Sequence, residues 1–304
     1  MGGQFPRVSI GMPVYNGERY IEQAIESILA QTFSDFELII SDNASTDRTA
    51  DICRSYVVRD RRIRYCRNET NIGYARNQNL VIELSSGEYF LCAHHDDVRA
   101  PQCLERCIEI LEKNPSVVLC YTYTRDIDEL GQPLPRTDPL LNLHALKPRD
   151  RFRDMIRMDH ICEPDFGLIR ASVLKKTGLH GYYADSDRVF LAELALYGPF
   201  HRIPEYLFFR RAHALQSTAQ CSDRQSRTRW YDPSKIGEIV FPHFREFREY
   251  LRIIGRVPIP LTEKLYCYAS MMKWVLANRR RLSDDLTVAT KDILRPFVKA
   301  LVVR

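Results

Sequence analysis

The sequence predicts an α/β protein in which a mostly parallel sheet is flanked by helices and followed by a helical C-terminal extension. Short apolar, β-type runs alternate with segments of helical periodicity through the first half of the chain. This alternation is typical of parallel strands joined by crossover helices. After residue 220 the strand-like runs end and basic helical segments follow, without an internal repeat in either part.

The elements are expected in a regular order. Apolar strands are predicted at 8–12, 36–40, 63–65 and 89–92, with helices over 21–29, from about Ser45, and over 75–84. Another helix is predicted at 101–113, where Pro101 suits a first turn because the N–H that it lacks would have no partner there. Beyond it we expect a strand at 117–123, a long loop at 130–150, a strand at 166–170, a helix from about 184 and a strand at 206–209.

The totals fit a globular protein with two parts. A length of 304 residues allows about two domain-sized units and a sizeable core, and we place the boundary between 1–220 and 221–304. No apolar run approaches the roughly 20 residues that span a membrane, and no basic-then-apolar leader is visible. The nine cysteines are scattered without a C-x-x-C pair, as in reduced cytosolic proteins. We therefore expect a cytoplasmic location.

The net charge of +5 is unevenly distributed. Residues 221–304 contain 17 Lys and Arg against 9 Asp and Glu, and the rest of the chain contains 27 against 30. This asymmetry indicates an anionic partner for the C-terminal part. Nucleic acid is not expected, because aromatic residues do not interleave the basic ones in repeats. Either the basic helices form a solvated face, or they contact anionic lipid peripherally at the inner membrane face. A helical apolar stripe accompanies the charge: Leu261, Leu265, Tyr268, Met272, Val275 and Leu276.

Polar clusters follow the predicted strands, where ligands bind in open parallel sheets. They occupy 12–16, 41–47, 71–77 and 94–97. Asn16 and Ser45 have a simpler explanation as helix caps, and Asp42 as a turn former. Adjacent Asp96 and Asp97 after a buried strand are harder to explain in this way, because like charges in a cleft repel each other unless a cation compensates.

Together these segments resemble the inverting family 2 glycosyltransferases, which have the Rossmann-like GT-A fold. The matching text is P-V-Y-N at 13–16, S-D-N-A-S-T-D at 41–47, N-I-G-Y-A-R-N at 71–77 and H-H-D-D at 94–97. The resemblance covers about two-thirds of the chain, roughly residues 6–215. It implies a nucleotide-sugar-binding half at 1–113, an acceptor half at 114–220, and a divalent ion, Mn²⁺ or Mg²⁺.

The resemblance also implies roles for individual donor-binding residues. Asp42 would accept the N3–H of a uridine-type base, with Asn43 beside it, and Arg76 would offer a forked cation to the diphosphate. Asp96 would hold ribose or sugar hydroxyls, and Asp97 would bind the metal. The walls of the base and ribose site would be Pro13, Tyr15 and Asn16.

One position departs from the family pattern. His94 stands where the family's D-x-D-D text has its first carboxylate, and neutral imidazole is a poorer partner for Mg²⁺. We therefore expect Asp96 and Asp97 to carry the function, with His94 or His95 near the donor; the alternative is that both histidines only finish the strand. A zinc site from Cys92, His94 and His95 is disfavoured, because alternating side chains on an extended segment diverge.

The second half supplies a base and a further ligand by the same resemblance. Asp187 is expected to be the general base, with Asp185 as the runner-up, although carboxylates at a helix start are often simple caps. The helix N-terminus should lower the pKa of Asp187. His213 belongs to an R-x-H text at 211–213, whose histidine faces metal or diphosphate in the family; the alternative is an exposed basic loop.

These observations favour metal-dependent transfer of a sugar to an acceptor hydroxyl with inversion. The resemblance favours a UDP-sugar donor and a glycan or lipid-linked acceptor. A nucleotidyltransferase acting on sugar phosphates is the second interpretation, although its glycine- and lysine-rich first loop is missing. A catalytically inactive carbohydrate- or partner-binding domain is the third, and the intact Asp96, Asp97 and Asp187 argue against it.

Overall fold

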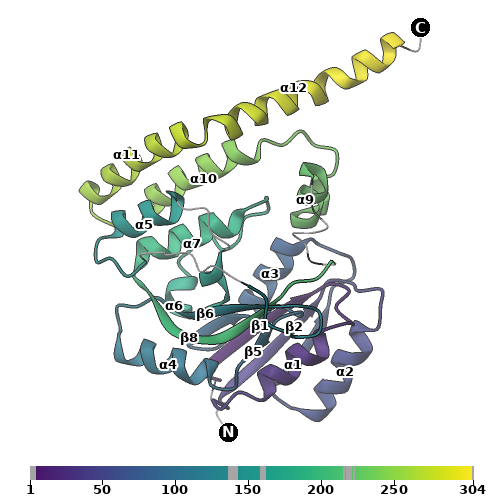
Figure 1. Ribbon diagram of the computed structural model, residues 1–304, viewed down its shortest axis with the longest axis vertical. Helices are drawn as coiled ribbons and strands as arrows, with labels where there is room; N and C mark the ends of the chain where they lie inside the picture. The colour runs from purple at the N-terminus through teal and green to yellow at the C-terminus, as the bar shows by residue number, and fades with distance from the viewer. Residues whose placement is uncertain are drawn as a thin grey trace.

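The computed structural model describes residues 5–135, 143–157, 162–214, 216, 221 and 223–302, without the side chains of 291–302. Part of the loop predicted at 130–150 therefore lies outside the described residues. Figure 1 shows one twisted sheet with helices on both faces, and a second group of helices at the opposite end of the molecule from the N-terminus. The predicted α/β class and helical C-terminal extension are confirmed.

Eight strands form one mixed sheet in the order β3-β2-β1-β4-β7-β6-β8-β5. The pairs β1–β2, β2–β3, β1–β4 and β6–β8 are parallel, and β4–β7, β6–β7 and β5–β8 are antiparallel. The strands are β1 (Val8–Val14), β2 (Phe36–Asp42), β3 (Ile63–Arg67), β4 (Tyr89–Cys92), β5 (Val98–Arg99), β6 (Leu119–Ile127), β7 (Leu168–Arg170) and β8 (Phe200–Arg211).

Alternate residues of the central strands pack into two separate cores, one on each face of the sheet. In β2, Leu38 and Ile40 pack on the side covered by α1 (Ile21–Leu29), α2 (Thr49–Arg59) and α4 (Cys103–Lys113). Ile39 packs on the other side, with α3 (Tyr74–Glu83), α5 (Pro148–Arg157) and α7 (Ser186–Tyr197). Because both faces are covered, β1 and β2 are buried at every position.

The C-terminal helices extend the second core. They are α9 (Arg224–Tyr231), α10 (Pro242–Arg256), α11 (Leu261–Ala277) and α12 (Arg279–Val302). Ile254 of α10 and Trp274 of α11 belong to the same apolar cluster as Phe152 of α5 and Phe190 of α7. The boundary at 220 stays a prediction. Among the described helices, none is both long and apolar enough to cross a membrane.

Several elements differ from the sequence-based prediction. Strands β6 and β8 are longer than expected and pair with each other over nearly their whole length, with a register irregularity near Tyr123. The length of β8 was underestimated from the sequence, because its charged side chains lie on a partly exposed strand and interrupt the apolar pattern. The sequence did not indicate β5, α5 or the four-residue helix α6 (Ala171–Leu174).

One buried ion pair ties α10 to α7. The Glu193 carboxylate is 2% exposed and accepts hydrogen bonds from the Arg256 guanidinium and from the Gly178 N–H at 3.0 Å. A carboxylate with this little solvent depends on its donors, since a buried charge without a partner is strongly destabilising.

We therefore expect Arg256→Met to lower the free energy of unfolding by about 2–3 kcal/mol, because it leaves Glu193 buried without its cation. Urea denaturation followed by far-UV circular dichroism measures the change. Arg252→Met is the matched control: Arg252 on the same helix is 70% exposed and pairs with Glu249 at 3.6 Å, so its loss should cost less than about 0.5 kcal/mol. Equal effects of the two substitutions would contradict the assignment.

Candidate active site

A cleft of about 610 Å³ opens at the carboxyl ends of β1, β2 and β4. Its floor comes from the segments after these strands, and α9 and the turn η2 (Pro233–Lys235) close it from the C-terminal side. Figure 1 shows α9 beside α3 at this edge of the sheet. Of the predicted site residues, those that line the cleft are Pro13, Tyr15, Asn16, Asn43, Asp96 and His213; Asp42, Arg76, Asp97 and Asp187 do not line it.

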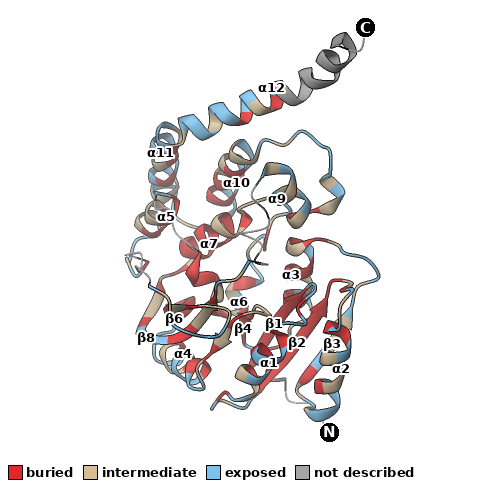
Figure 2. Cartoon of the chain, turned by 45° about the vertical axis from the view of Figure 1, so that its right-hand side comes forward, coloured by how far each residue is buried: buried red, intermediate tan, exposed pale blue. Residues whose placement is uncertain are grey.

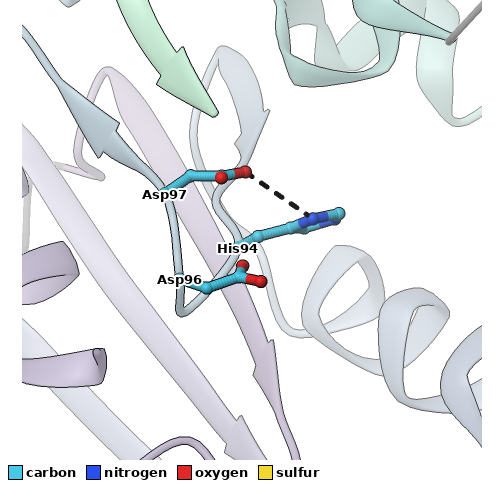
Figure 3. A group of neighbouring side chains, drawn as sticks. All are labelled: His94, Asp96 and Asp97. Carbon is cyan, nitrogen blue, oxygen red and sulfur yellow. Dashed lines mark ion pairs between the residues drawn. The ribbon is translucent and has the colours of Figure 1, made fainter. Parts of the chain in front are cut away.

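The loop after β4 gathers three side chains that could hold a metal ion. Ligand atoms of His94, Asp96 and Asp97 all lie within 4.8 Å of one another. Figure 3 shows the three side chains projecting from the loop toward the same side. His94 Nδ1 is 3.9 Å from Asp97 Oδ2. Cys92 takes no part in this group, since its Sγ lies 2.9 Å from Gln78 Nε2.

Arg211 holds this loop in place. Its backbone N–H donates to Asp97 Oδ1 at 2.9 Å and its Nε donates to the Asp96 carbonyl at 3.0 Å. The other guanidinium nitrogens donate to the carbonyls of Asp128 and Glu129 and to Gln23 Oε1. Arg211 is 2% exposed. One residue thus links α1, the loop that carries Asp96 and Asp97, and the turn after β6, and no role beyond the R-x-H text was predicted for it.

His213 reaches the same carboxylates from the end of β8. Its Nε2 lies 2.9 Å from Asp96 Oδ2, and its ring packs against Tyr20 with centroids 4.8 Å apart. Its Nδ1 is buried and has no hydrogen-bond partner among the described residues, as is also the case for His94 Nε2. Unpaired buried nitrogens beside two carboxylates fit a site that a ligand completes.

The two carboxylates differ in their pKa. Burial, and then the charge of Asp96, raise the pKa of Asp97 well above its usual value. Burial acts in the same direction on Asp96, but His95 and the hydrogen bond from His213 outweigh it and leave its pKa below the usual value. Burial lowers the pKa of His94 to about 4, so its imidazole is neutral at pH 7. The group therefore lacks positive charge of its own beside Asp97, which suits a divalent cation with oxygen ligands.

One wall of the cleft is a hydrogen-bonded network between the ends of β1 and β2. Asn16 has a positive φ of 52°, and its side-chain oxygen accepts from the Thr46 N–H at 2.8 Å. Asn43 Oδ1 accepts from the Ile72 N–H at 2.9 Å, and its Nδ2 donates to Asn71 at 2.9 Å. Both side chains therefore line the cleft and also stabilise its wall through their hydrogen bonds.

Asp42 lies behind this wall and is fully buried. Its carboxylate accepts from the Ser45 N–H at 2.8 Å, the Tyr65 hydroxyl at 2.7 Å and Arg67 at 2.8 Å. Three of its roughly four acceptor positions are thus occupied. Its role toward a base remains a prediction.

Arg76 is engaged away from the cleft. Its guanidinium is 3.7 Å from Asp232 and lies over the Tyr182 ring at 4.4 Å. Because the structure does not bring it to the cleft wall, its role toward a diphosphate also remains a prediction.

The two candidate bases lie at the start of α7. Asp185 has a positive φ of 64° and pairs with Arg227 of α9. Asp187 is partly buried, hydrogen-bonds Cys162, and lies within electrostatic range of Tyr74, which lines the cleft. Burial, and then the charge of Asp185, raise the pKa of Asp187. The expected lowering by the helix N-terminus is therefore wrong in sign, because burial dominates the helix dipole here.

Helix α9 contributes to the cleft, which was not predicted from the sequence. Trp230 stacks on Tyr74 with ring centroids 4.1 Å apart and an interplanar angle of 14°. Gly73 has a positive φ of 87°, and a Cβ there would lie 2.6 Å from the Tyr231 carbonyl. A side chain at residue 73 would push the two helices apart. The sequence feature that could have indicated this contribution is the pair of adjacent aromatic residues, Trp230 and Tyr231, in a basic segment.

The fold and the cleft define an α/β protein of the GT-A type, and comparison with known proteins identifies its family. The sequence model of glycosyl transferase family 2 matches residues 9–178, more than half of the chain. The chain belongs to glycosyl transferase family 2, and the resemblance seen in the sequence is confirmed.

Individual relatives support this assignment. An uncharacterized glycosyltransferase of Rickettsia prowazekii is 32% identical over 70% of this chain and 66% of its own length. One from Haemophilus influenzae is 27% identical over 73% of this chain and 71% of its own length. In another, from Methanocaldococcus jannaschii, the match is 28% identical over 56% of this chain and spans 58% of the relative's length.

Solved structures confirm the GT-A fold. The 1–349 fragment of Staphylococcus aureus TarS superposes with a TM-score of 0.66 at 15% identity, over 94% of this chain and 80% of that chain. The mannosyltransferase PcManGT of Pyrobaculum calidifontis superposes with a TM-score of 0.56 at 16% identity, over 99% of this chain and 82% of that chain. At these identities the likeness concerns the fold.

The Arg211 contacts lead to a prediction. We expect Arg211→Lys to weaken Mn²⁺ binding by about 10–100-fold, because an ammonium cannot reproduce the fork that orients the Asp96–Asp97 loop. Titration of Mn²⁺ followed by electron paramagnetic resonance measures it. Arg210→Lys is the control, since Arg210 precedes Arg211 on β8 and pairs with Asp126 of β6. Unchanged Mn²⁺ affinity in a folded Arg211→Lys protein would refute this role.

Proposed function

We propose that this protein transfers a sugar from a nucleotide-sugar donor, with a UDP-sugar favoured, to an acceptor hydroxyl with inversion at the anomeric carbon, in a metal-dependent reaction. The observation that carries the proposal is the Asp96–Asp97 pair at the cleft formed by the carboxyl ends of the parallel strands. Related folds bind such donors: TarS has been solved with UDP-GlcNAc, and PcManGT with GDP-Man and Mn²⁺.

The residues of the group fit a divalent ion. Asp96 and Asp97 offer oxygen ligands, His94 offers a neutral imidazole, and His213 reaches the group through Asp96. Mn²⁺ suits this mixed oxygen and nitrogen set better than Mg²⁺, which prefers oxygen alone. When bound, such an ion supplies positive charge that stabilises a leaving diphosphate.

The chain's own residues would position the donor and move a proton. Asn16, Asn43 and Tyr15 would wall the base and ribose, because they meet at the ends of β1 and β2. A hydroxyl is a weak nucleophile at neutral pH, so a carboxylate must accept its proton as the bond to the anomeric carbon forms. We assign this step to Asp187, whose raised pKa makes it a stronger base than an exposed aspartate.

The acceptor and the location extend the same proposal. We propose a glycan or lipid-linked acceptor, reached at the cytoplasmic face of a membrane to which the basic region 221–304 binds peripherally.

The donor class is tested by incubating the protein with UDP-, GDP- and dTDP-sugars and measuring released nucleoside diphosphate with and without Mn²⁺. Release that requires Mn²⁺ supports the proposal. A nucleotidyltransferase would instead consume a nucleoside triphosphate with a sugar phosphate, and an inactive binding domain would consume neither.

Asp97→Asn should lower Mn²⁺-dependent donor turnover by at least about 100-fold, the scale of losing an electrostatic element at a reacting site. Asparagine keeps an oxygen that can accept from the Arg211 N–H, so thermal stability should change little. Asp60→Asn is the control, since Asp60 pairs with Arg62 in the turn before β3. Full turnover in Asp97→Asn, or in the wild type with excess EDTA, would exclude the assigned role.

Asp187→Asn should lower turnover by about 100-fold or more while donor affinity stays near that of the wild type. The pH profile separates it from Asp185. Turnover requires ionised Asp187 and should rise with pH through its raised pKa. Because the charge of Asp185 contributes to that raising, Asp185→Asn should move the acid limb to lower pH and keep the plateau. Turnover that survives in Asp187→Asn but not in Asp185→Asn would reverse the assignment, and a product of retained configuration would exclude inversion.

A further inference from the structure

Helix α11 carries two apolar faces, and one of them has no partner among the described residues. Cys267, Met271 and Trp274 are buried in the core shared with α5 and α10. The stripe foreseen in the sequence lies on another side of the helix, except that its member Val275 packs against this core. Its members Leu261, Leu265, Met272 and Leu276 are 70%, 58%, 67% and 65% exposed, and Tyr268 between them is 37% exposed.

These five residues form one continuous surface. Their spacings along α11 are four, three, four and four, which keeps them on one side of a helix of 3.6 residues per turn. Figure 1 shows α11 at the upper edge of the molecule, separated from the sheet by α5 and α7. In Figure 2 exposed residues run along α11, whereas α7 beneath is largely buried. We call Leu261, Leu265, Tyr268, Met272 and Leu276 the α11 face.

The positive charge of the C-terminal region is not uniform in the folded chain. Most described cations on α9, η2 and α10 are neutralised within the protein. The ion pairs are Arg224–Asp285, Arg227–Asp185, Lys235–Glu238, Arg248–Glu249, Arg252–Glu249 and Arg256–Glu193. Much of the charge counted from the sequence is therefore unavailable to a partner.

Of the cations that remain, Arg229 and Arg245 lie on α9 and α10, and five more lie on α11 or directly after it. Lys264 and Lys273 lie on α11, and Arg279, Arg280 and Arg281 follow at the start of α12. None of the five forms an ion pair with a described residue; Lys264 and Arg279 donate only to backbone carbonyls. Between residues 261 and 283 the single acidic residue is Glu263, which pairs with Arg149 at 3.4 Å. The apolar face and the unpaired positive charge thus coincide.

Charge complementarity decides which occupant fits this surface. A second copy of the chain seated on the same face would bring two such groups of five cations together, and Asp284 is the single carboxylate between residues 261 and 290 that has no ion pair among the described residues. An anionic lipid surface offers negative headgroups for the cations and an acyl boundary for the leucines, which is the usual arrangement of a basic amphipathic helix lying in a membrane interface.

We propose that the α11 face, flanked by Lys264, Lys273 and Arg279 to Arg281, docks this protein on an anionic membrane surface. The helix lies along the interface, with its leucines and methionine in the headgroup–acyl boundary. The proposed function explains why the protein would dock, since docking brings the cleft to a lipid-linked acceptor; in this respect alone the docking rests on the proposed function. The interaction itself needs no turnover.

Flotation with lipid vesicles tests the docking. The full chain is mixed at low salt with vesicles of phosphatidylcholine, or of phosphatidylcholine with about one-third phosphatidylglycerol. We expect at least about tenfold more protein on the anionic vesicles, and loss of binding at about 1 M salt, where screening shortens the reach of charge to about 3 Å. Wild-type protein that fails to float with anionic vesicles overturns the proposal.

Two double variants separate the two contributions. Leu265→Glu with Met272→Glu should reduce anionic-vesicle binding by at least about tenfold, and Lys273→Glu with Arg280→Glu should do the same. Val58→Glu is the matched control, because Val58 on α2 is 89% exposed and far along the chain from α11; it should bind like the wild type. Equal binding by the wild type and the Leu265/Met272 variant overturns the proposal.

Two parallel measurements keep the outcomes distinct. Nucleoside-diphosphate release in solution should be unchanged in the Leu265/Met272 variant, which also shows that it is folded. If the wild type binds vesicles but turns over no donor, the proposed function fails and the docking stands. If light scattering shows a dimer that this variant splits, and vesicles are not bound, the face belongs to a second copy and the docking is wrong.

Discussion

The repulsion between two adjacent carboxylates at the end of β4 is the constraint around which the cleft is built. Asp96 and Asp97 are held together by donors from β8, with Arg211 on the backbone and side chain of the loop and His213 on Asp96. Arg99 lies nearby, buried over Phe208, and its charge lowers the pKa of Asp97 against the effect of burial. These contacts reduce the repulsion without removing it, which leaves the site suited to a cation.

The same constraint explains why strands distant in sequence must meet. Residues 94–97 leave the sheet beside β1, and β8 reaches them from the other half of the chain through its pairing with β5. The antiparallel β7 between β4 and β6 joins the two halves into one sheet. The two halves of the chain can then share one cleft without a hinge between separate sheets.

The C-terminal region has two different relations to this cleft. Helix α9 forms part of its wall, since Trp230 stacks on Tyr74 and Asp232 pairs with Arg76. Helices α10 and α11 instead extend the core on α5 and α7, and the cations that they leave unpaired gather at one end of the molecule. Within residues 221–304, folding therefore separates the basic side chains into those paired inside the protein and those left unpaired at its surface.

The sequence by itself determined the fold class, the order of the first elements and the family, because apolar periodicity and the polar segments at strand ends are local signals. It also identified Asp96, Asp97 and His213, which lie together in the folded chain. Only the tertiary structure decided that Asp42 is fully enclosed, that Arg76 faces Asp232, that burial raises the pKa of Asp187, and that the stripe on α11 faces outward. Each of these four features depends on which residues pack opposite the side chain. Contacts between segments far apart in the chain cannot be predicted from the spacing of neighbouring residues.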